Sequence, residues 1–262
     1  MERSAYDRFF ALETTHFWRI AKRRLVLDWL RRYGPPAGGL RLLDIGGACS
    51  LIPKELEHWG EVQVIEVDPE TVQFARTRLG LDVREGRFPD NVPVQGPFDV
   101  VTMLDVLEHI EDDATSLLAA RRLLKPDGVL LVTVPALGWL WSDHDVVLHH
   151  YRRYTRGELV AKLDAAGFSM TRVSYYTGLL LPELVAERMA GKLQSKITGR
   201  RKVIYHVKPP PGPLNSLFGL AMSFERWMLG SFDCRLGSSL IAAAKPRRDE
   251  SATGRGSSRL AA

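Results

Sequence analysis

Long apolar runs, paired cysteines and metal-binding spacings are all scarce in this 262-residue sequence. The longest apolar stretches are short, such as 217–224, whereas a membrane-spanning helix needs roughly 20 apolar residues, so no span is predicted. Two cysteines, Cys49 and Cys234, cannot form a disulfide framework or a four-thiolate site. No His/Cys/Asp spacing resembles a zinc site, so no metal is predicted. Acidic residues near Met1 argue against a secretory signal, and a cytoplasmic location is expected.

The composition that is present is that of a globular protein with an uneven charge. Hydrophobic residues make up 45% of the chain and charged residues 26%, enough for one large or two small domains. The net charge is +5, yet residues 190–262 contain 13 Lys/Arg and only 4 Asp/Glu. A basic end favours an anionic partner, such as a membrane surface, nucleic acid or another protein. A solvated basic tail is the alternative interpretation.

Strand-like and helix-like runs alternate over most of the chain, which predicts a doubly wound α/β sheet. Strands are predicted at 41–45, 62–67, 82–85, 98–104, 129–134, 168–176 and 238–245. Helices are predicted at 51–59, 69–79, 113–124 and 155–166, with helical patches at 180–189 and 214–229. Turn residues at 125–128 separate a helix from the strand that follows. Residues 137–154 have no clean period and are predicted to form a long loop.

A turn of small residues follows the first predicted strand in Leu42-Leu-Asp-Ile-Gly-Gly-Ala-Cys-Ser50. Small residues let the backbone approach a ligand, and the next helix N-terminus offers N–H donors to an anionic group. Glu66 ends the second predicted strand, where an acid can accept both hydroxyls of a ribose. Asp68 is the competitor for this role, but the register of the following helix favours Glu66. Together these features indicate a nucleoside-binding α/β fold.

Five segments between 41 and 176 resemble, in order, those of the class I S-adenosylmethionine-dependent methyltransferases. Leu43-Asp-Ile-Gly-Gly47 is similar to the first motif, and Val64-Ile-Glu-Val-Asp-Pro-Glu70 is similar to the second. Segments 98–110 and 123–132 resemble the region beside the transferring methyl group and the fifth-strand turn. Last, Ser142-Asp-His-Asp145 and His150-Tyr-Arg-Arg-Tyr-Thr155 resemble a subgroup of small-molecule methyltransferases associated with sugar or lipid biosynthesis.

The resemblance implies a Rossmann-like seven-stranded sheet whose last strand is antiparallel, and S-adenosylmethionine as the cofactor. The residues that it places at the cofactor are Asp44, Gly46, Gly47, Glu66, Gly86, Arg87, Leu104 and Asp105. Histidine is well suited to accept a proton near neutral pH. The catalytic candidates are therefore His150, His109 and the neighbouring Tyr151, although histidines in loops and helix caps more often serve packing. Arg152 and Arg153 either hold an anionic group of the acceptor or pair with local acids.

The resemblance breaks at two places. The family reads Asp-x-Gly-x-Gly-x-Gly, but Ala48 and Ser50 stand at the later glycine positions. If either backbone needs a positive φ, its side chain costs about 1 kcal/mol, and weakened cofactor binding is expected. The family also often has an Asp that meets the adenine amine where this chain has Gly86-Arg87. Arginine cannot accept a hydrogen bond, so adenine contacts would come from backbone groups or stacking.

The predicted organisation has five parts. Residues 1–40 form an N-terminal helical cap, 41–176 the cofactor-binding core, 177–237 a helical insertion facing the substrate or a membrane surface, 238–246 the last core strand, and 247–262 a disordered tail. The insertion contains the basic cluster Arg200-Arg-Lys202. The predicted activity is methyl transfer to an oxygen or nitrogen of a small or lipid- or sugar-linked acceptor, with peripheral contact at the inner membrane surface.

Three alternative functions stay open. A nicotinamide-dependent oxidoreductase predicts a full Gly-x-Gly-x-x-Gly, which the segment 46–50 does not supply. A nucleic-acid methyltransferase favours an Asn/Asp-Pro-Pro-Tyr type of segment after the fourth strand, and Leu104-Asp-Val-Leu107 stands there instead, so no nucleic acid is expected. The altered glycine turn and the basic C-terminal section are also compatible with a non-catalytic cofactor-binding partner of a membrane-associated biosynthetic enzyme.

Overall fold

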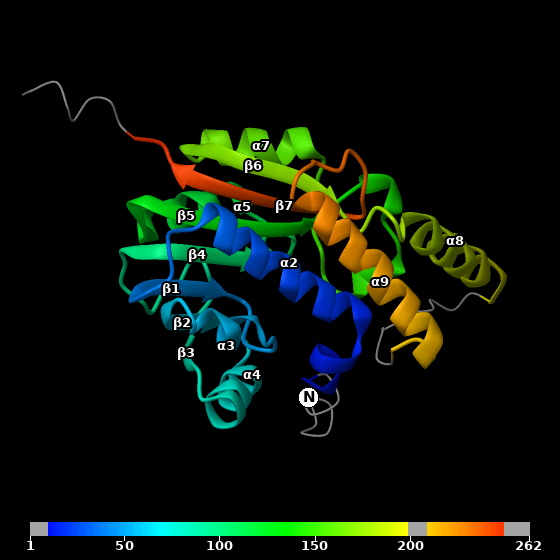
Figure 1. Cartoon of the computed structure of the whole chain (residues 1–262), viewed down its shortest axis with the longest axis horizontal. Coiled ribbons are helices and arrows are strands. Elements are labelled where there is room, and N and C mark those ends of the chain that lie inside the picture. Colours follow the sequence, from blue (N-terminus) through cyan, green and yellow to red (C-terminus); the bar gives the residue numbers. More distant parts are fainter. Residues whose placement is uncertain (1–9, 199–208, 249–262) are drawn as a thin grey trace, which may run out of the picture.

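The chain forms one seven-stranded mixed sheet with the strand order β3-β2-β1-β4-β5-β7-β6 (Figure 1). The computed structural model describes residues 10–198 and 209–248. The strands are β1 Leu40–Ile45, β2 Gly60–Glu66, β3 Asp82–Glu85, β4 Phe98–Leu104, β5 Leu124–Pro135, β6 Phe168–Tyr176 and β7 Ser239–Pro246. Strands β1 to β5 are parallel, and β7 runs antiparallel to both of its neighbours. The predicted fold class is confirmed.

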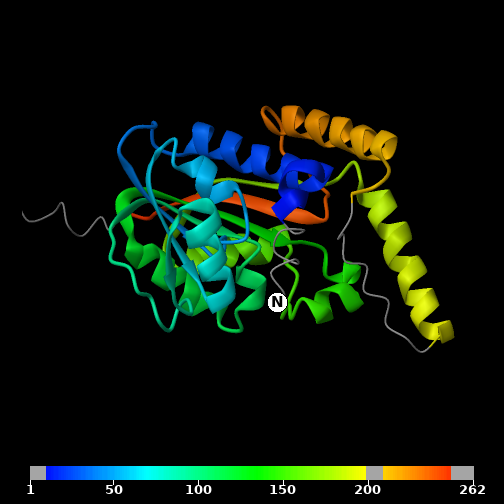
Figure 2. The ribbon, with the colours of Figure 1, turned by 90° about the horizontal axis from the view of Figure 1, so that it is seen from below.

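Helices cover both faces of the sheet (Figures 1 and 2). The helices are α2 Phe17–Tyr33, α3 Ile52–Leu56, α4 Pro69–Phe74, α5 Asp113–Leu123, α6 Asp143–Val147, α7 Arg156–Ala165, α8 Leu181–Thr198 and α9 Gly212–Leu229. Strand side chains alternate between two apolar clusters, as the period of two requires. Leu42 and Val64 join side chains from α2, α3, α4 and α9, whereas Leu43 and Ile65 join side chains from α5 and α7.

Two sequence predictions assigned the wrong type of local structure. The predicted loop 137–154 contains a 3₁₀ turn, Gly138–Leu140, and the helix α6. Five residues are too few to show a helical period, but Ser142 and Asp145 start α6 with a capping box. Strand β5 begins at Leu124, which pairs with Phe98, and not at the predicted residue 129. The turn residues 125–128 lie inside the strand, where the register between β4 and β5 shifts.

Smaller differences concern element ends and segments outside the described residues. Helix α3 is shorter than predicted, α8 is longer, and α4 continues as a π-helical turn over Ala75–Leu79. The basic cluster 200–202 and most of the predicted tail, 249–262, lie outside the described residues.

The segment between β6 and β7 is tied to the first half of the chain through α2. Helices α2 and α9 lie side by side, with the rings of Phe17 and Phe218 5.2 Å apart and an ion pair between Asp28 and Arg226 (Figure 1). Glu225 of α9 is buried and accepts hydrogen bonds at 3.0–3.2 Å from the backbone N–H groups of Gly178 and Leu179, directly after β6. This carboxylate therefore fastens α9 to the end of the sheet.

We expect Glu225→Ala to lower the free energy of unfolding by about 1–2 kcal/mol, because it removes the acceptor of two partly buried backbone N–H groups. Glu225→Gln keeps an acceptor oxygen and should cost much less. Urea titrations of the two variants measure the difference through their midpoints. Equal losses for both would show that the negative charge, rather than the hydrogen bonds, matters here.

Candidate active site

The sequence-predicted cofactor residues converge at the carboxyl ends of β1, β2 and β4. Strand β1 has β2 on one side and β4 on the other, so the chain leaves these strands toward opposite flanks. Ligands of open α/β sheets bind in the crevice at such a point. Asp44, Glu66 and Asp105 stand at or just after the three strand ends.

Asp44 is the most buried of these acids. One carboxylate oxygen, Oδ1, accepts a hydrogen bond from the hydroxyl of Thr102, its register partner on β4. The other, Oδ2, is buried and has no hydrogen-bond partner in the described part of the chain. Burial raises the pKa of this carboxyl from 3.8 to about 7, although the Thr102 hydrogen bond and the Lys22 ammonium lower it. A buried oxygen without a partner is a group that a ligand can satisfy.

The glycine turn after β1 needs glycine at only its first two positions. Gly46 has a φ of 75°, and a Cβ on Gly47 would lie 1.7 Å from Asp44 Oδ2. Ala48 and Ser50 are not among the residues with positive φ, and Ala48 is fully buried in the core. The condition for strain at these two family departures, a positive φ, is therefore not met.

Backbone N–H groups at the N-terminus of α3 already have hydrogen-bond acceptors from the chain itself. Ser50 Oγ accepts a hydrogen bond from the N–H of Ile52, and Glu13 Oε2 accepts one from the N–H of Leu51 at 3.3 Å. Glu13 is buried, forms an ion pair with Arg19 at 2.6 Å, and comes from the N-terminal segment. A carboxylate of the chain thus occupies the place where the sequence predicts a ligand.

Glu66 is the last residue of β2, the strand between β1 and β3. Its Oε1 accepts hydrogen bonds from the N–H groups of Val67 and Asp68 at 2.8 and 3.2 Å. Burial raises its pKa, and the surrounding backbone N–H groups, that of Ala48 included, oppose the rise. The side chain of Asp68 instead caps α4, where it accepts hydrogen bonds from the N–H and hydroxyl of Thr71. Glu66, rather than Asp68, is therefore the acid available at this strand end.

The two predicted adenine-side residues differ in their surroundings. Gly86 is buried after β3, and its N–H donates to the carbonyl of Glu66 at 2.9 Å. A Cβ on Gly86 would lie 2.6 Å from the Asn91 carbonyl oxygen, so glycine is required there. Arg87 is exposed.

Asp105 is joined to a lysine that the sequence analysis did not single out. Lys22, on the buried side of α2, places its Nζ 2.5 Å from Asp105 Oδ2, and Thr133 Oγ1 donates to Asp105 Oδ1 at 2.8 Å. Burial disfavours the charged form of Asp105, but Lys22 and Thr133 outweigh it and lower the pKa. Asp105 also has a φ of 56°. The sequence feature that could have revealed Lys22 is its position within an apolar helix stripe, beside Ala21, Leu25 and Val26.

Two of the three catalytic candidates come together. The rings of His109 and His150 meet edge to face, with centroids 4.6 Å apart, and His150 Nδ1 lies 3.0 Å from Asp145 Oδ1. Asp145 is completely buried and also receives Arg153 Nε at 2.8 Å. Burial opposes ionisation of Asp145, yet these two partners lower its pKa. Tyr151 is separate, because its side chain is exposed under the guanidinium of Arg152.

His109, His150 and the buried Glu108 form the one cluster with metal-ligand spacing in the described part of the chain, with one ligand atom from each residue within 4.8 Å of the others. Such a set could hold an ion, although burial and the nearby charge of Asp105 raise the pKa of Glu108 well above its usual range. The sequence did not indicate this cluster because His150 is far along the chain from Glu108 and His109. Arg152 and Arg153 pair with Asp113 and Asp145 respectively, which favours their structural interpretation.

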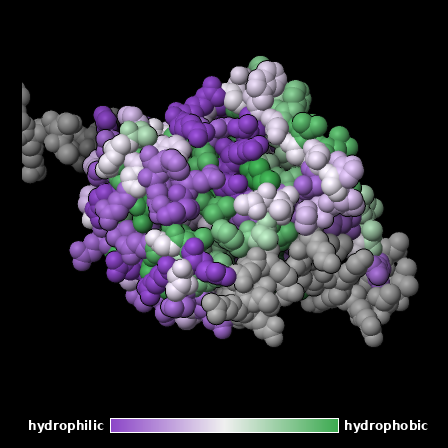
Figure 3. Space-filling view, turned by 60° about the horizontal axis from the view of Figure 1, so that its bottom comes forward, coloured by the Kyte–Doolittle hydropathy of each residue, from purple (hydrophilic) through white to green (hydrophobic). Residues whose placement is uncertain are grey.

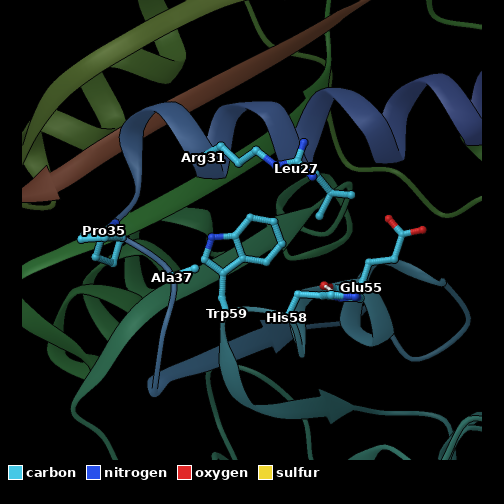
Figure 4. A pocket seen from close by; sticks show the side chains of 8 residues that line it. Leu27, Arg31, Pro35, Ala37, Glu55, His58 and Trp59 are labelled. Carbon is cyan, nitrogen blue, oxygen red and sulfur yellow. Dashed lines mark hydrogen bonds between the residues drawn. The ribbon is translucent and has the colours of Figure 1, made fainter.

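A separate pocket of about 530 Å³ lies near the opposite edge of the sheet (Figure 4). Trp59 comes directly before β2, and the segment 35–37 precedes β1, so the pocket is at the amino ends of these strands. Arg31 of α2 stacks over the Trp59 ring at 5.6 Å. None of the predicted site residues lines this pocket.

Comparison with known proteins gives a consistent result. Residues 17–173 match the family described as "Methyltransferase domain". A ubiquinone biosynthesis O-methyltransferase of Xylella fastidiosa is 32% identical over 210 residues, which cover 65% of this chain and 85% of that protein. A protein of the same name from Xanthomonas axonopodis pv. citri is 31% identical over 168 residues, covering 56% and 70%.

Solved structures share the fold at low sequence identity. The methyltransferase in complex with the Haloferax volcanii Trm112 activator has a TM-score of 0.58 at 16% identity, covering 94% of this chain and 96% of that one. Haemonchus contortus phosphoethanolamine N-methyltransferase 2, in complex with S-adenosyl-L-methionine, has a TM-score of 0.56 at 16% identity, covering 90% and 59%.

The family match and the named relatives show an S-adenosylmethionine-dependent methyltransferase that acts on a small-molecule acceptor, and the sheet order agrees with this class. The chain belongs to the methyltransferase domain family. The oxidoreductase, nucleic-acid and non-catalytic alternatives are thereby set aside.

Asp44 gives the unliganded protein a specific pH dependence. Because its pKa is raised from 3.8 to about 7, the folded state holds a proton that the unfolded chain has lost. This stabilisation is present below about pH 4 and disappears as the pH rises through about 7. Asp44→Asn does not titrate, so the stability of the wild-type protein relative to this variant should fall by about 4 kcal/mol between about pH 4 and pH 8.

Urea titrations at several pH values measure this difference, with the exposed Asp127→Asn as the control. A constant difference between Asp44→Asn and the wild-type protein across that range would show that Asp44 titrates as an ordinary carboxyl.

Proposed function

We propose that this methyltransferase transfers the methyl group to a hydroxyl oxygen of a small, lipid- or sugar-linked acceptor, with His150 as the base. The observation that carries the proposal is the pairing of His150 with the buried Asp145 at the carboxyl edge of the sheet. The O-methyltransferase names of the two relatives support oxygen as the methylated atom. The apolar helices between β6 and β7 support an acceptor with an apolar part.

The residues present fit S-adenosylmethionine. Gly46 and Gly47 form the turn from backbone alone, because Val106 and Asp44 occupy the space that side chains would need there. Asp44 has a buried oxygen without a partner among the described residues, and Glu66 is placed to accept ribose hydroxyls. Gly86, Arg87, Leu104 and Asp105 border the same strand ends and complete the proposed cofactor site. We add Lys22, whose ammonium lies beside Asp105 and lowers the pKa of Asp44.

The cofactor supplies a methyl group that is already activated by the positive sulfur. The protein's part is to align the acceptor and to receive its proton, and alignment alone contributes several kcal/mol, or roughly 7–11 kcal/mol at best. With Asp145 ionised, His150 donates from Nδ1 to that carboxylate, which leaves Nε2 as the proton acceptor. His109 lies against His150, and burial together with His150 lowers the pKa of His109 and favours its neutral form.

The segments 142–145 and 150–155 support membership of the proposed subgroup of small-molecule methyltransferases. In this chain their contacts fix the segment that follows β5. Asp145 joins His150 and Arg153, whose guanidinium also donates to the Ala136 carbonyl at 3.0 Å. Tyr154 is buried and donates to Asp113 Oδ2 at 2.9 Å. These contacts support a role of both segments in positioning His150.

The proposed organisation keeps the N-terminal cap, the core, the insertion and the last strand as units, in a cytoplasmic protein that contacts the inner membrane surface. No helix among the described residues has the length and hydropathy of a membrane span. Exposed apolar side chains on α9 support the membrane contact.

Glu66→Ala should weaken binding of S-adenosylmethionine by roughly 1–3 kcal/mol, because the ribose hydroxyls lose a charged acceptor. Asp68→Ala removes the cap of α4 and should cost about 1 kcal/mol of stability with a smaller effect on binding. Calorimetric titration with S-adenosylmethionine and S-adenosylhomocysteine compares the two. A larger loss of affinity in Asp68→Ala would move the ribose site to that residue.

His150→Ala should lower kcat by about 10²–10⁴ and abolish the acid limb of the pH–rate profile, with unchanged affinity for S-adenosylhomocysteine. Asp145→Asn should lower kcat less, because His150 stays but loses its orienting charge. His149→Asn is the matched control, since His149 is exposed at a φ of 57° that asparagine tolerates. Full activity in His150→Ala with a hydroxyl acceptor would exclude His150 as the base.

A further inference from the structure

Helix α9 exposes an apolar face along most of its length. Leu214, Leu217, Leu220, Phe224 and Trp227 recur at intervals of three or four residues, so they lie along one side of the helix. Leu220 and Trp227 are 69% and 71% exposed, and the rings of Phe224 and Trp227 stack at 5.7 Å. Hydrophobic side chains also gather at the upper right of Figure 3, in the region of α9.

This face is separate from the one that holds α9 in the fold. Met222, Glu225 and Leu229 are the buried residues of α9, and Phe218 packs on Phe17 of α2. Packing on α2 therefore leaves the five-residue stripe uncovered. Contiguous exposed apolar patches on a folded protein commonly mark a docking surface.

The sequence that leads into α9 and through most of it contains basic residues and no acidic ones. Between Ala190 and Phe224 the sequence has no Asp or Glu. The same stretch contains Lys192, Lys196, Arg200, Arg201, Lys202 and Lys208. In the fold, Arg32 of α2 lies beside Gly230 at the other end of α9, and Arg235 is exposed shortly after it. An apolar stripe in basic surroundings is complementary to an anionic lipid surface.

A second copy of the chain is a poorer occupant. Two-fold symmetric dimers bring the same patch of both copies together, so Arg32 and Arg235 of one copy would face those of the other. Five side chains also fall well short of the roughly 20–30 residues that each partner contributes to a stable interface.

We propose that α9 is an interfacial membrane anchor, which lies flat on an anionic bilayer with Leu217, Leu220, Phe224 and Trp227 inserted below the headgroups. Tryptophan is enriched at this depth of a bilayer. The contact is peripheral, as the described helices include none that could span a membrane. The inference rests on the membrane contact in the proposed function, and its test measures lipid binding instead of turnover, so that the two proposals can fail separately.

The test is flotation of the full chain with vesicles of phosphatidylcholine alone and of phosphatidylcholine mixed equally with phosphatidylglycerol. The wild-type protein should bind the mixed vesicles more tightly, and part of that binding should persist at high salt, because salt screens exposed charges but not apolar contacts. Leu220→Ser should weaken binding by about tenfold, and the triple variant Leu220→Ser, Phe224→Ser, Trp227→Ser by more. Leu118→Ser, an exposed leucine on α5, is the matched control and should bind as the wild-type protein does.

Affinity for S-adenosylhomocysteine shows that each variant is folded, and the single variant decides the matter if the triple variant is not. The proposal is overturned if the wild-type protein fails to bind the mixed vesicles, or if Leu220→Ser binds them like the wild-type protein. It is also overturned if sedimentation shows a wild-type dimer that the variants dissociate while vesicle binding stays the same. That result would assign the face to a second copy.

Discussion

The buried carboxyl of Asp44 is the constraint on which the cofactor end of the structure depends. It is the second-last residue of β1, accepts a hydrogen bond from the hydroxyl of Thr102 on β4, and occupies the space that any side chain on Gly47 would need. The turn must therefore pass over it as backbone alone, and its first residue, Gly46, turns back with a positive φ. One acid thus sets the register of two strands and the shape of the loop that a ligand approaches.

Two further buried acids hold the irregular segment after β5. Asp145 pairs with His150 and Arg153. Asp113 accepts hydrogen bonds from Arg152, Lys162 and Tyr154. Buried carboxylates are costly unless paired, and each of these is satisfied by several donors from different parts of the chain. The regular structure of this segment is limited to one 3₁₀ turn and the short helix α6, so these pairs contribute much of what fixes the positions of the histidines.

Sequence patterns predicted the sheet well because buried parallel strands have strong apolar signals and the glycine turn has a strict steric cause. Glu66 was separable from Asp68 by register. Lys22 and Glu13 were missed because a residue in an N-terminal helix reaches the site only through tertiary packing. Helix α6 was missed because its five residues are shorter than a detectable period, although its capping residues are visible in the sequence. Neither spacing nor composition could show that Asp145 and His109 both contact His150.

The parallel pairing of α2 and α9 bears on how the protein is made. Helix α2 leaves the ribosome early, whereas α9 begins at Gly212, after six of the seven strands. Until α9 emerges, the side of α2 around Phe17 and Asp28 has no partner, and the insertion has not closed on β6. During that interval the nascent chain therefore exposes apolar side chains of α2 that α9 covers in the folded protein, a surface of the kind that chaperones bind.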